Sequence, residues 1–257
     1  MKASNLAWEW GIANFVMNRR EPTPKGIVLG VNPRGYADRM VPVLRVESDG
    51  KAPTIVFGVA AHAGASAASD RVSGDHPGFA QAELESQYPG AQAMFIAGAA
   101  GDANAHPKSG IEDARTHGHT LALEVARGLG GKLKPVEGPL VTLLERADLP
   151  LPPTTRFVDG ATEVFDKGGR LSSMYSAPFA LWRFGDGLTL VGLSGEPVSD
   201  FAVMAARSSA RSTCGSPDIP TTYSGTWRRR GCWARADTRR ADCTSEWGCP
   251  IRRWTAP

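Results

Sequence analysis

Two neighbouring stretches of the chain have the apolar patterns that are typical of β-strands. Residues 41–48 (VPVLRVES) alternate apolar and polar side chains, and residues 54–60 (TIVFGVA) form an apolar run rich in β-forming residues. Asp49-Gly50 lies between them, and this dipeptide favours a type I′ turn. The pattern predicts a β-hairpin over residues 41–60.

Apolar residues at helical spacing predict two helices in the first half of the chain. One covers 77–88, where Pro77 suits a first helical turn, and the other covers about 111–128. Glycines at 128–131 follow the second helix. They are therefore typical of a helix C-terminus and not of a phosphate-binding loop, which opens a helix.

The remaining pattern mixes strands and helices without strict alternation. Strands are expected at 93–97, 140–149, 179–185 and 188–193, and a third helix at 198–206. This order favours an α/β fold with a mixed layered sheet and flanking helices, followed by an irregular C-terminal tail. We expect a catalytic domain over 1–206 and a separate tail over 207–257.

Charge and composition change abruptly in the tail. Of the 29 basic and 26 acidic residues, ten arginines and four acids fall in 207–257, so the body has a net charge of −3. All four cysteines also lie there, at uneven spacings that suit a zinc ribbon poorly: Cys214, Cys232, Cys243 and Cys249. The acidic body argues against nucleic-acid binding unless the tail provides it.

The tail resembles a gene read in the wrong frame. From 214 to 257 it has four tryptophans and eight arginines but no Leu, Val, Phe, Met or Lys. With suitable synonymous codons, the stretch from Thr213 rereads in another frame as text with alternating apolar residues and a YSND…GY segment. A non-enzymatic module that binds nucleic acid or another anion through an Arg/Trp-rich tail is the alternative function.

Other segments exclude some classes. No apolar run is long enough for a transmembrane helix, and residues 1–10 do not form a signal peptide. The nucleophile elbow G-x-S-x-G of serine hydrolases is absent, since Gly192-Leu-Ser-Gly-Glu lacks the final glycine.

Polar residues at strand ends and in small-residue loops are the candidates for chemistry. His62 ends the strand TIVFGVAAH, where it suits a metal ligand or a catalytic base, although a lone histidine is more often structural. Glu196 follows the strand LTLVG and precedes a helix, so it suits either cation binding or helix capping. The loop 98–107 projects Asp102, Asn104 and His106 from a backbone of Gly and Ala.

Three further groups have simpler interpretations. Arg19 and Arg20 could hold an anion but more commonly are solvated charges. Ser73 and Asp75 precede a helix and are expected to cap it, with support of His62 as the alternative. His117 and His119 point in different directions on one helix and are expected to be packing or surface residues.

The order of these motifs resembles the neutral/alkaline non-lysosomal ceramidase family. The resemblance covers roughly residues 10–206 and rests on Asn18-Arg19-Arg20, the hairpin VPVLRV…TIVFGVAAH, SGDHPGFAQAELESQYPGAQAMF, the AGDANAHP loop and LSGEP. The bacterial members of the family are the most similar.

The resemblance implies a zinc ion held by two histidines, a glutamate and a tyrosine. His62 matches the second histidine and Glu196 the glutamate. The first histidine belongs to a motif upstream of Asn18, so this chain is expected to be a fragment. The tyrosine corresponds to the reread segment, and Tyr223 does not take that role.

The resemblance also implies the chemistry. Zinc would polarise an amide carbonyl and lower the pKa of its bound water to roughly 7. Arg19 and Asn104 are then candidates to steady the oxyanion, and Asp102 to orient a ligand or the loop. Family ceramidases have a serine at the position of Asn104. The resemblance therefore supports a family-type zinc site in this chain more than it supports specificity for ceramide.

The expected function is thus zinc-dependent hydrolysis of a small-molecule or lipid amide, with a chain that is incomplete and inactive alone because two of four ligands hold zinc weakly. We expect zinc as cofactor, no nucleic-acid partner and no transmembrane segment. Oligomeric state and cellular location are left open, although family members are often secreted or periplasmic.

Overall fold

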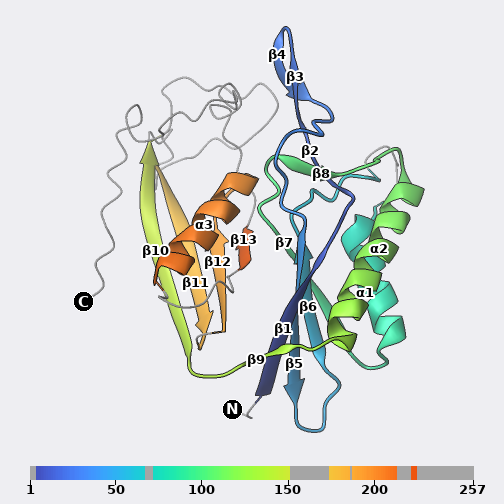
Figure 1. Cartoon of the computed structure of the whole chain (residues 1–257), viewed down its shortest axis with the longest axis vertical. Helices are drawn as coiled ribbons and strands as arrows, with labels where there is room; N and C mark the ends of the chain where they lie inside the picture. Colours follow the sequence, from blue (N-terminus) through green and yellow to red (C-terminus); the bar gives the residue numbers. More distant parts are fainter. Residues whose placement is uncertain (1–3, 67–71, 151–173, 186, 213–220, 225–257) are drawn as a thin grey trace.

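The computed structural model describes residues 4–66, 72–150, 174–185, 187–212 and 221–224. In this part of the chain, two larger β-sheets are layered against each other, with helices on their outer faces (Figure 1). The predicted α/β class with a mixed sheet and flanking helices is confirmed. Most of the predicted tail lies outside the described residues, and helix α3 continues past residue 206 to Ser212.

The first sheet forms the centre of the molecule and has the strand order β7-β6-β5-β1-β9. Its strands pair antiparallel except β6 and β7, which are parallel and are joined through helix α1. The strands are β1 (Ser4–Ile12), β5 (Met40–Ser48), β6 (Thr54–Val59), β7 (Gln92–Ala97) and β9 (Lys134–Val136).

Helices α1 (Asp75–Gln87) and α2 (Ile111–Gly130) pack on each other and cover one face of this sheet (Figure 1). Because apolar and polar residues alternate along the strands, the apolar side chains on one face of the sheet pack against these two helices. Burying each large side chain in this layer contributes about 1.5–3 kcal/mol. The core includes Val41, Val43, Ile55, Phe57, Leu84, Leu121 and Val125. No helix among the described residues is long and apolar enough to cross a bilayer.

The second sheet lies against the other face of the first and has the order β10-β11-β12-β13. Leu188 and Leu190 of β12 line a small cavity of about 30 Å³ together with Trp8 and Phe57 of the first sheet, so the two sheets meet there. The elements are β10 (Leu140–Pro150), β11 (Met174–Phe184), β12 (Leu188–Leu193), β13 (Thr221–Ser224) and the covering helix α3 (Ser199–Ser212).

Two short antiparallel pairs complete the architecture. Strand β2 (Val16–Asn18) pairs with β8 (Ala103–Ala105), and β3 (Arg20–Thr23) pairs with β4 (Gly26–Leu29) in a hairpin that projects from the body (Figure 1). Through β2 and β8, the Asn18-Arg19-Arg20 segment is placed directly beside the Gly98–His106 loop.

The predicted hairpin exists, but the predicted type I′ turn is wrong. Strand pairing ends at Val46 and Thr54, so the connection is longer than two residues. Lys51 donates its backbone N–H to the Ser48 carbonyl at 3.1 Å, and of the two central residues only Gly50 has a positive φ, of 70°. A type I′ turn needs positive φ at both central residues.

Candidate functional site

Strand ends from both sheets meet at one edge, where the candidate residues lie. His62 follows β6, and the 98–102 loop follows the neighbouring parallel strand β7, so both emerge at the same sheet edge. Glu196 follows β12 of the second sheet. The Gly101 N–H donates to the Pro197 carbonyl at 2.8 Å, which ties the loop of the first sheet to the loop of the second.

The structure brings the two predicted zinc ligands together. The His62 Nε2 lies 3.5 Å from the Glu196 Oε2. Both side chains are largely shielded, with exposed fractions of 27% for His62 and 17% for Glu196. The buried Nε2 makes no well-formed hydrogen bond within the described part of the chain, although it lies beside the Glu196 carboxylate.

This separation suits two ligands of one zinc ion. Zn–N and Zn–O bonds of about 2.1 Å in tetrahedral geometry place neighbouring ligand atoms about 3.4 Å apart. Imidazole nitrogen and carboxylate oxygen are both ordinary zinc donors. Among the described residues, however, no group of three or more His, Cys, Asp or Glu side chains is arranged to hold a metal. His62 and Glu196 are thus two side chains of the types that zinc binds, at a spacing that suits it, and the described residues add no third.

The surroundings of His62 favour the neutral ring that a metal ligand must be. Burial lowers the pKa of His62, and the positive charge of Arg19 lowers it further, while the Glu196 carboxylate acts in the opposite direction. A lowered pKa favours the uncharged imidazole, which is the form that coordinates a cation.

Arg19 connects the remaining candidates. Its Nη2 lies 3.5 Å from the Glu196 Oε2 and donates to the Gly101 carbonyl at 2.9 Å, and its Nη1 donates to the Asn104 Oδ1 at 3.3 Å. Only 13% of the Arg19 side chain is exposed. A guanidinium fixed by three partners is a directed positive charge, not the solvated one that is commoner for such residues.

Arg20 supports the same loop. Its Nη2 donates to the Gly101 carbonyl at 2.6 Å, so this one oxygen receives both guanidinium groups. Burial and the adjacent charge of Arg19 lower the pKa of Arg20 to about 10, which still leaves it charged at neutral pH. The two arginines hold the 98–104 loop against Glu196.

Asp102 acts as an anchor for helix α3. Its Oδ1 accepts from the Ser199 N–H at 2.9 Å and from the Ser199 hydroxyl at 2.7 Å, and its Oδ2 is 3.5 Å from the Asn18 amide nitrogen. A carboxylate at a helix N-terminus is stabilised by the first N–H groups and the helix dipole. Sequence reasoning proposed that Asp102 orients a ligand or the loop, and it missed the contact with Ser199, the first residue of α3.

Asn104 lies between Arg19 and His62. Residues His62 and Asn104 form an isolated parallel β-bridge, and the His62 N–H donates to the Ala103 carbonyl at 3.2 Å. Since the Asn104 Oδ1 accepts from Arg19, its NH2 group is left to donate elsewhere, and it makes no hydrogen bond to a described residue. This group is well suited to receive a developing negative charge.

Gly101 allows the close approach of the two loops. A Cβ atom at this position would collide with the backbone carbonyl of Glu196 and approach that of Pro197. The glycine of the G-D-A-N motif is thus required by the contact that brings Glu196 to the site, a reason that the sequence alone did not show.

Asp75 fixes the loop that follows His62. Its Oδ2 accepts from the Ser66 N–H at 2.7 Å and the Ser66 hydroxyl at 2.6 Å, and its Oδ1 accepts from the His76 N–H at 2.8 Å. Ser73 accepts from the Asp75 N–H at 3.0 Å. The expected capping is not found, because the N-cap of α1 is Gly74 and makes no side-chain cap bond. Ser73 and Asp75 bind N–H groups of the first turn instead, and the bonds of the Asp75 carboxylate go to Ser66 and His76 and not to His62.

The other histidines are not at this site. His117 is buried beside Phe15, and its Nε2 is 2.7 Å from the Pro107 carbonyl. His119 is exposed and pairs with Glu83 at 2.9 Å. Both match the packing and surface roles expected for them. The tail cysteines, and with them most of the Arg/Trp-rich segment, lie outside the described residues; the backbone of Tyr223 is part of β13.

Comparison with solved structures identifies a shared fold. The chain superimposes on a structure described as ceramidase complexed with C2, with a TM-score of 0.65 and 14% identity, over 88% of this chain and 47% of that one. It also matches neutral ceramidase from Pseudomonas aeruginosa, with a TM-score of 0.61 and 17% identity, over 88% of this chain and 45% of that one.

These likenesses establish the fold and not the activity. The chain spans less than half the length of the two ceramidases that it matches. No protein-family model and no curated protein sequence matches it. At fold level, the molecule is similar to a ceramidase-type hydrolase.

Proposed function

We propose that the chain carries part of the active site of a zinc-dependent amide hydrolase, with His62 and Glu196 as two zinc ligands. The single observation that carries this proposal is the 3.5 Å separation of the His62 Nε2 and the Glu196 Oε2, in a shielded site where Nε2 forms no hydrogen bond with a described residue. The ligand types and their spacing both suit zinc.

The fold supports an amide as the substrate class. Both similar structures are described as ceramidases, enzymes that cleave the amide bond of a lipid, and the superposition includes most of this chain. The proposed substrate is a small-molecule or lipid amide, and the site residues alone do not require ceramide.

Zinc, when bound, supplies polarisation of the amide carbonyl and activation of water at neutral pH. The residues of the chain would do the rest. Arg19 and the NH2 group of Asn104 face the region beside the ligand pair and would stabilise the oxyanion that forms as the amide carbonyl is attacked. Asp102 would hold this loop in place through Ser199.

We further propose that this chain alone is a weak zinc binder and lacks efficient turnover. Among the described residues, two protein ligands are present, and the affinity and geometry of catalytic zinc sites normally come from three. We therefore expect the chain to bind a zinc-chelating ligand in the presence of zinc, without efficient catalysis.

A hydroxamate provides the sharpest test, because it chelates zinc and mimics the attacked amide. We expect zinc to tighten the binding of octanohydroxamate to the chain, and His62→Ala and Glu196→Ala to lose this increase. His119→Ala is a matched control, since His119 is exposed on α2 and pairs with Glu83. Hydroxamate binding that is independent of zinc, or unchanged in both site variants, would contradict the zinc site.

An amide-hydrolysis assay tests the proposal that the chain alone lacks efficient turnover. With zinc in excess, we expect the wild-type chain to release no more fatty acid from N-acyl substrates than the His62→Ala variant does. Multiple turnovers by the chain alone would contradict the proposal that it lacks efficient turnover. They would not contradict the assignment of His62 and Glu196 as zinc ligands.

A further inference from the structure

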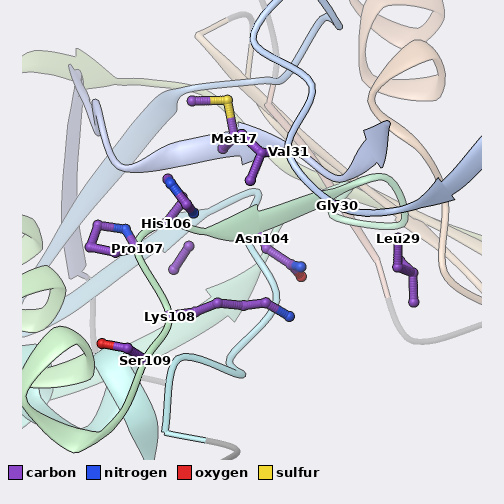
Figure 2. Close-up of a pocket in the computed structure, with 10 residues that line it drawn as sticks. Met17, Leu29, Gly30, Val31, Asn104, His106, Pro107, Lys108 and Ser109 are labelled. Carbon is purple, nitrogen blue, oxygen red and sulfur yellow. The ribbon is translucent and has the colours of Figure 1, made fainter. Parts of the chain in front are cut away.

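A cavity of about 340 Å³ opens beside Asn104, and its volume is at the lower end of those that hold small molecules (Figure 2). Met17, Leu29 and Val31 provide apolar walls, while Asn104, His106 and Lys108 provide polar groups. The walls come from β2, the segment at the end of β4 and the loop that follows β8.

The cavity is continuous with the face that bears His62. Met17 pairs with Asn104 across β2 and β8, and Asn104 forms the β-bridge with His62. Paired residues on adjacent strands project from the same face. Met17, Asn104 and His62 thus share one face, with Asn104 belonging both to the cavity wall and, through Arg19, to the candidate site.

The cavity wall carries one cationic side chain, and two carboxylates lie just outside it: the Glu21 Oε2 accepts from the Val31 N–H at 3.4 Å, and the Asp113 Oδ2 accepts from the Ser109 N–H at 2.6 Å. Lys108 is its one Lys or Arg, and none of its lining residues is acidic. Within the described part of the chain, Lys108 forms no ion pair or side-chain hydrogen bond. Figure 2 shows the Lys108 side chain running alongside Asn104, with its end pointing toward the side of the view on which Leu29 lies.

We infer that this cavity binds a carboxylate attached to a short apolar chain, which makes the preferred substrate an anionic N-acyl amide such as an N-acyl amino acid. This inference rests on the proposed amide hydrolase. The hydrocarbon would be buried against Met17, Leu29 and Val31, the carboxylate would pair with Lys108, and the amide carbonyl would accept from Asn104. Ceramide has no carboxylate, so this chemistry separates the chain from a ceramide-specific enzyme.

The test measures binding to the zinc-free chain by calorimetry, with N-octanoylglycine and its neutral counterpart N-octanoylethanolamine. We expect the anionic probe to bind at least tenfold more tightly, with affinity that falls as salt rises. Lys108→Met should remove this preference and leave the affinity for the neutral probe unchanged. Lys132→Met, outside the cavity, is the charge-matched control and should bind as the wild type does.

Octanoate distinguishes a substrate from a free fatty acid, since both bear a carboxylate on an apolar chain. Weaker binding of octanoate than of N-octanoylglycine is expected, because octanoate has no amide for Asn104. Equal binding of octanoate, equal binding of the neutral probe, or an unchanged preference in Lys108→Met would each overturn the inference. Because zinc is absent, these outcomes are independent of whether His62 and Glu196 bind metal.

Discussion

The His62 imidazole and the Glu196 carboxylate come from different sheets, yet their Nε2 and Oε2 atoms lie 3.5 Å apart. The contact depends on the Gly101 loop, which bonds to Pro197 on one side and to Arg19 and Arg20 on the other. The proximity of these two side chains is thus a consequence of how the two sheets are joined, and changes in this joint should affect it.

Replacing Gly101 with alanine should separate the pair. The added Cβ would collide with the Glu196 carbonyl, and the backbone on both sides must shift to admit it. We expect a loss of about 1–3 kcal/mol in the free energy of unfolding, together with weaker zinc binding. Urea denaturation and zinc titration measure the two effects.

Gly78→Ala is the control for that substitution. Gly78 lies in α1, where an added Cβ meets nothing within 4 Å, so alanine should slightly stabilise the helix. If Gly101→Ala behaves like Gly78→Ala, the close approach at Gly101 is not what positions Glu196.

Replacing Arg19 with methionine should raise the pKa of His62. Burial is the larger cause of the lowered pKa of His62 and would persist, but the repulsion from the Arg19 charge would disappear. NMR titration of the His62 ring should show a pKa closer to 6.5 than in the wild type. The exposed pair at Arg127 provides a control, since Arg127→Met should leave the His62 titration unchanged. A lower His62 pKa in Arg19→Met would contradict the assigned electrostatics.

Asp75→Asn should destabilise the protein in a pH-dependent way. Burial alone would raise the pKa of Asp75, but the hydrogen bonds from His76 and Ser66 outweigh it and lower that pKa. A lowered folded pKa contributes stability above the unfolded value of about 3.9, and this stability is lost as pH falls toward the folded pKa. Asparagine tolerates the positive φ of 51° at this position, so the charge is the main change.

Urea unfolding at several pH values measures this effect. At pH 7 we expect Asp75→Asn to lose about 1.5–3 kcal/mol, the usual value of hydrogen bonds to a charged group. Below about pH 4 the difference from the wild type should shrink. A difference that stays constant from pH 7 to pH 3 would show that the ionised carboxylate is not what holds Ser66.

Asp102→Ala should weaken the start of α3. The substitution removes the acceptor for the Ser199 N–H and hydroxyl, and loss of such a helix-terminal acceptor costs about 1–2 kcal/mol. Asp102→Asn keeps an oxygen acceptor and should cost less. Thermal unfolding of both variants measures the difference, and equal losses would assign the effect to charge and not to the hydrogen bonds at Ser199.

The sequence predicted those strands and helices whose apolar residues recur at a regular spacing within the element itself. The 41–60 hairpin and the 111–128 helix were predicted because burial of one face imposes their periods. Strand β1 was missed, although Leu6, Trp8, Trp10 and Ile12 recur at every second position. The short strands β2 and β8 give too few residues for any period to be visible.

The site was predicted residue by residue but not as a network. His62 and Glu196 were identified through strand ends and a family resemblance, whereas their proximity depends on contacts between the two sheets. The anchoring of Asp102 by Ser199 and of Asp75 by Ser66 could not be read from sequence, because serine at a helix start or in a loop has many partners available. Which partner each serine has depends on how distant segments of the chain pack together in the folded protein.

Calorimetric titration of zinc into the wild-type chain and into His62→Ala and Glu196→Ala tests the central claim most directly. We predict one weak zinc site in the wild type and at least a tenfold loss of affinity in each variant. The same affinity in all three proteins, or no zinc binding by the wild-type chain at millimolar concentration, would contradict a zinc site at His62 and Glu196.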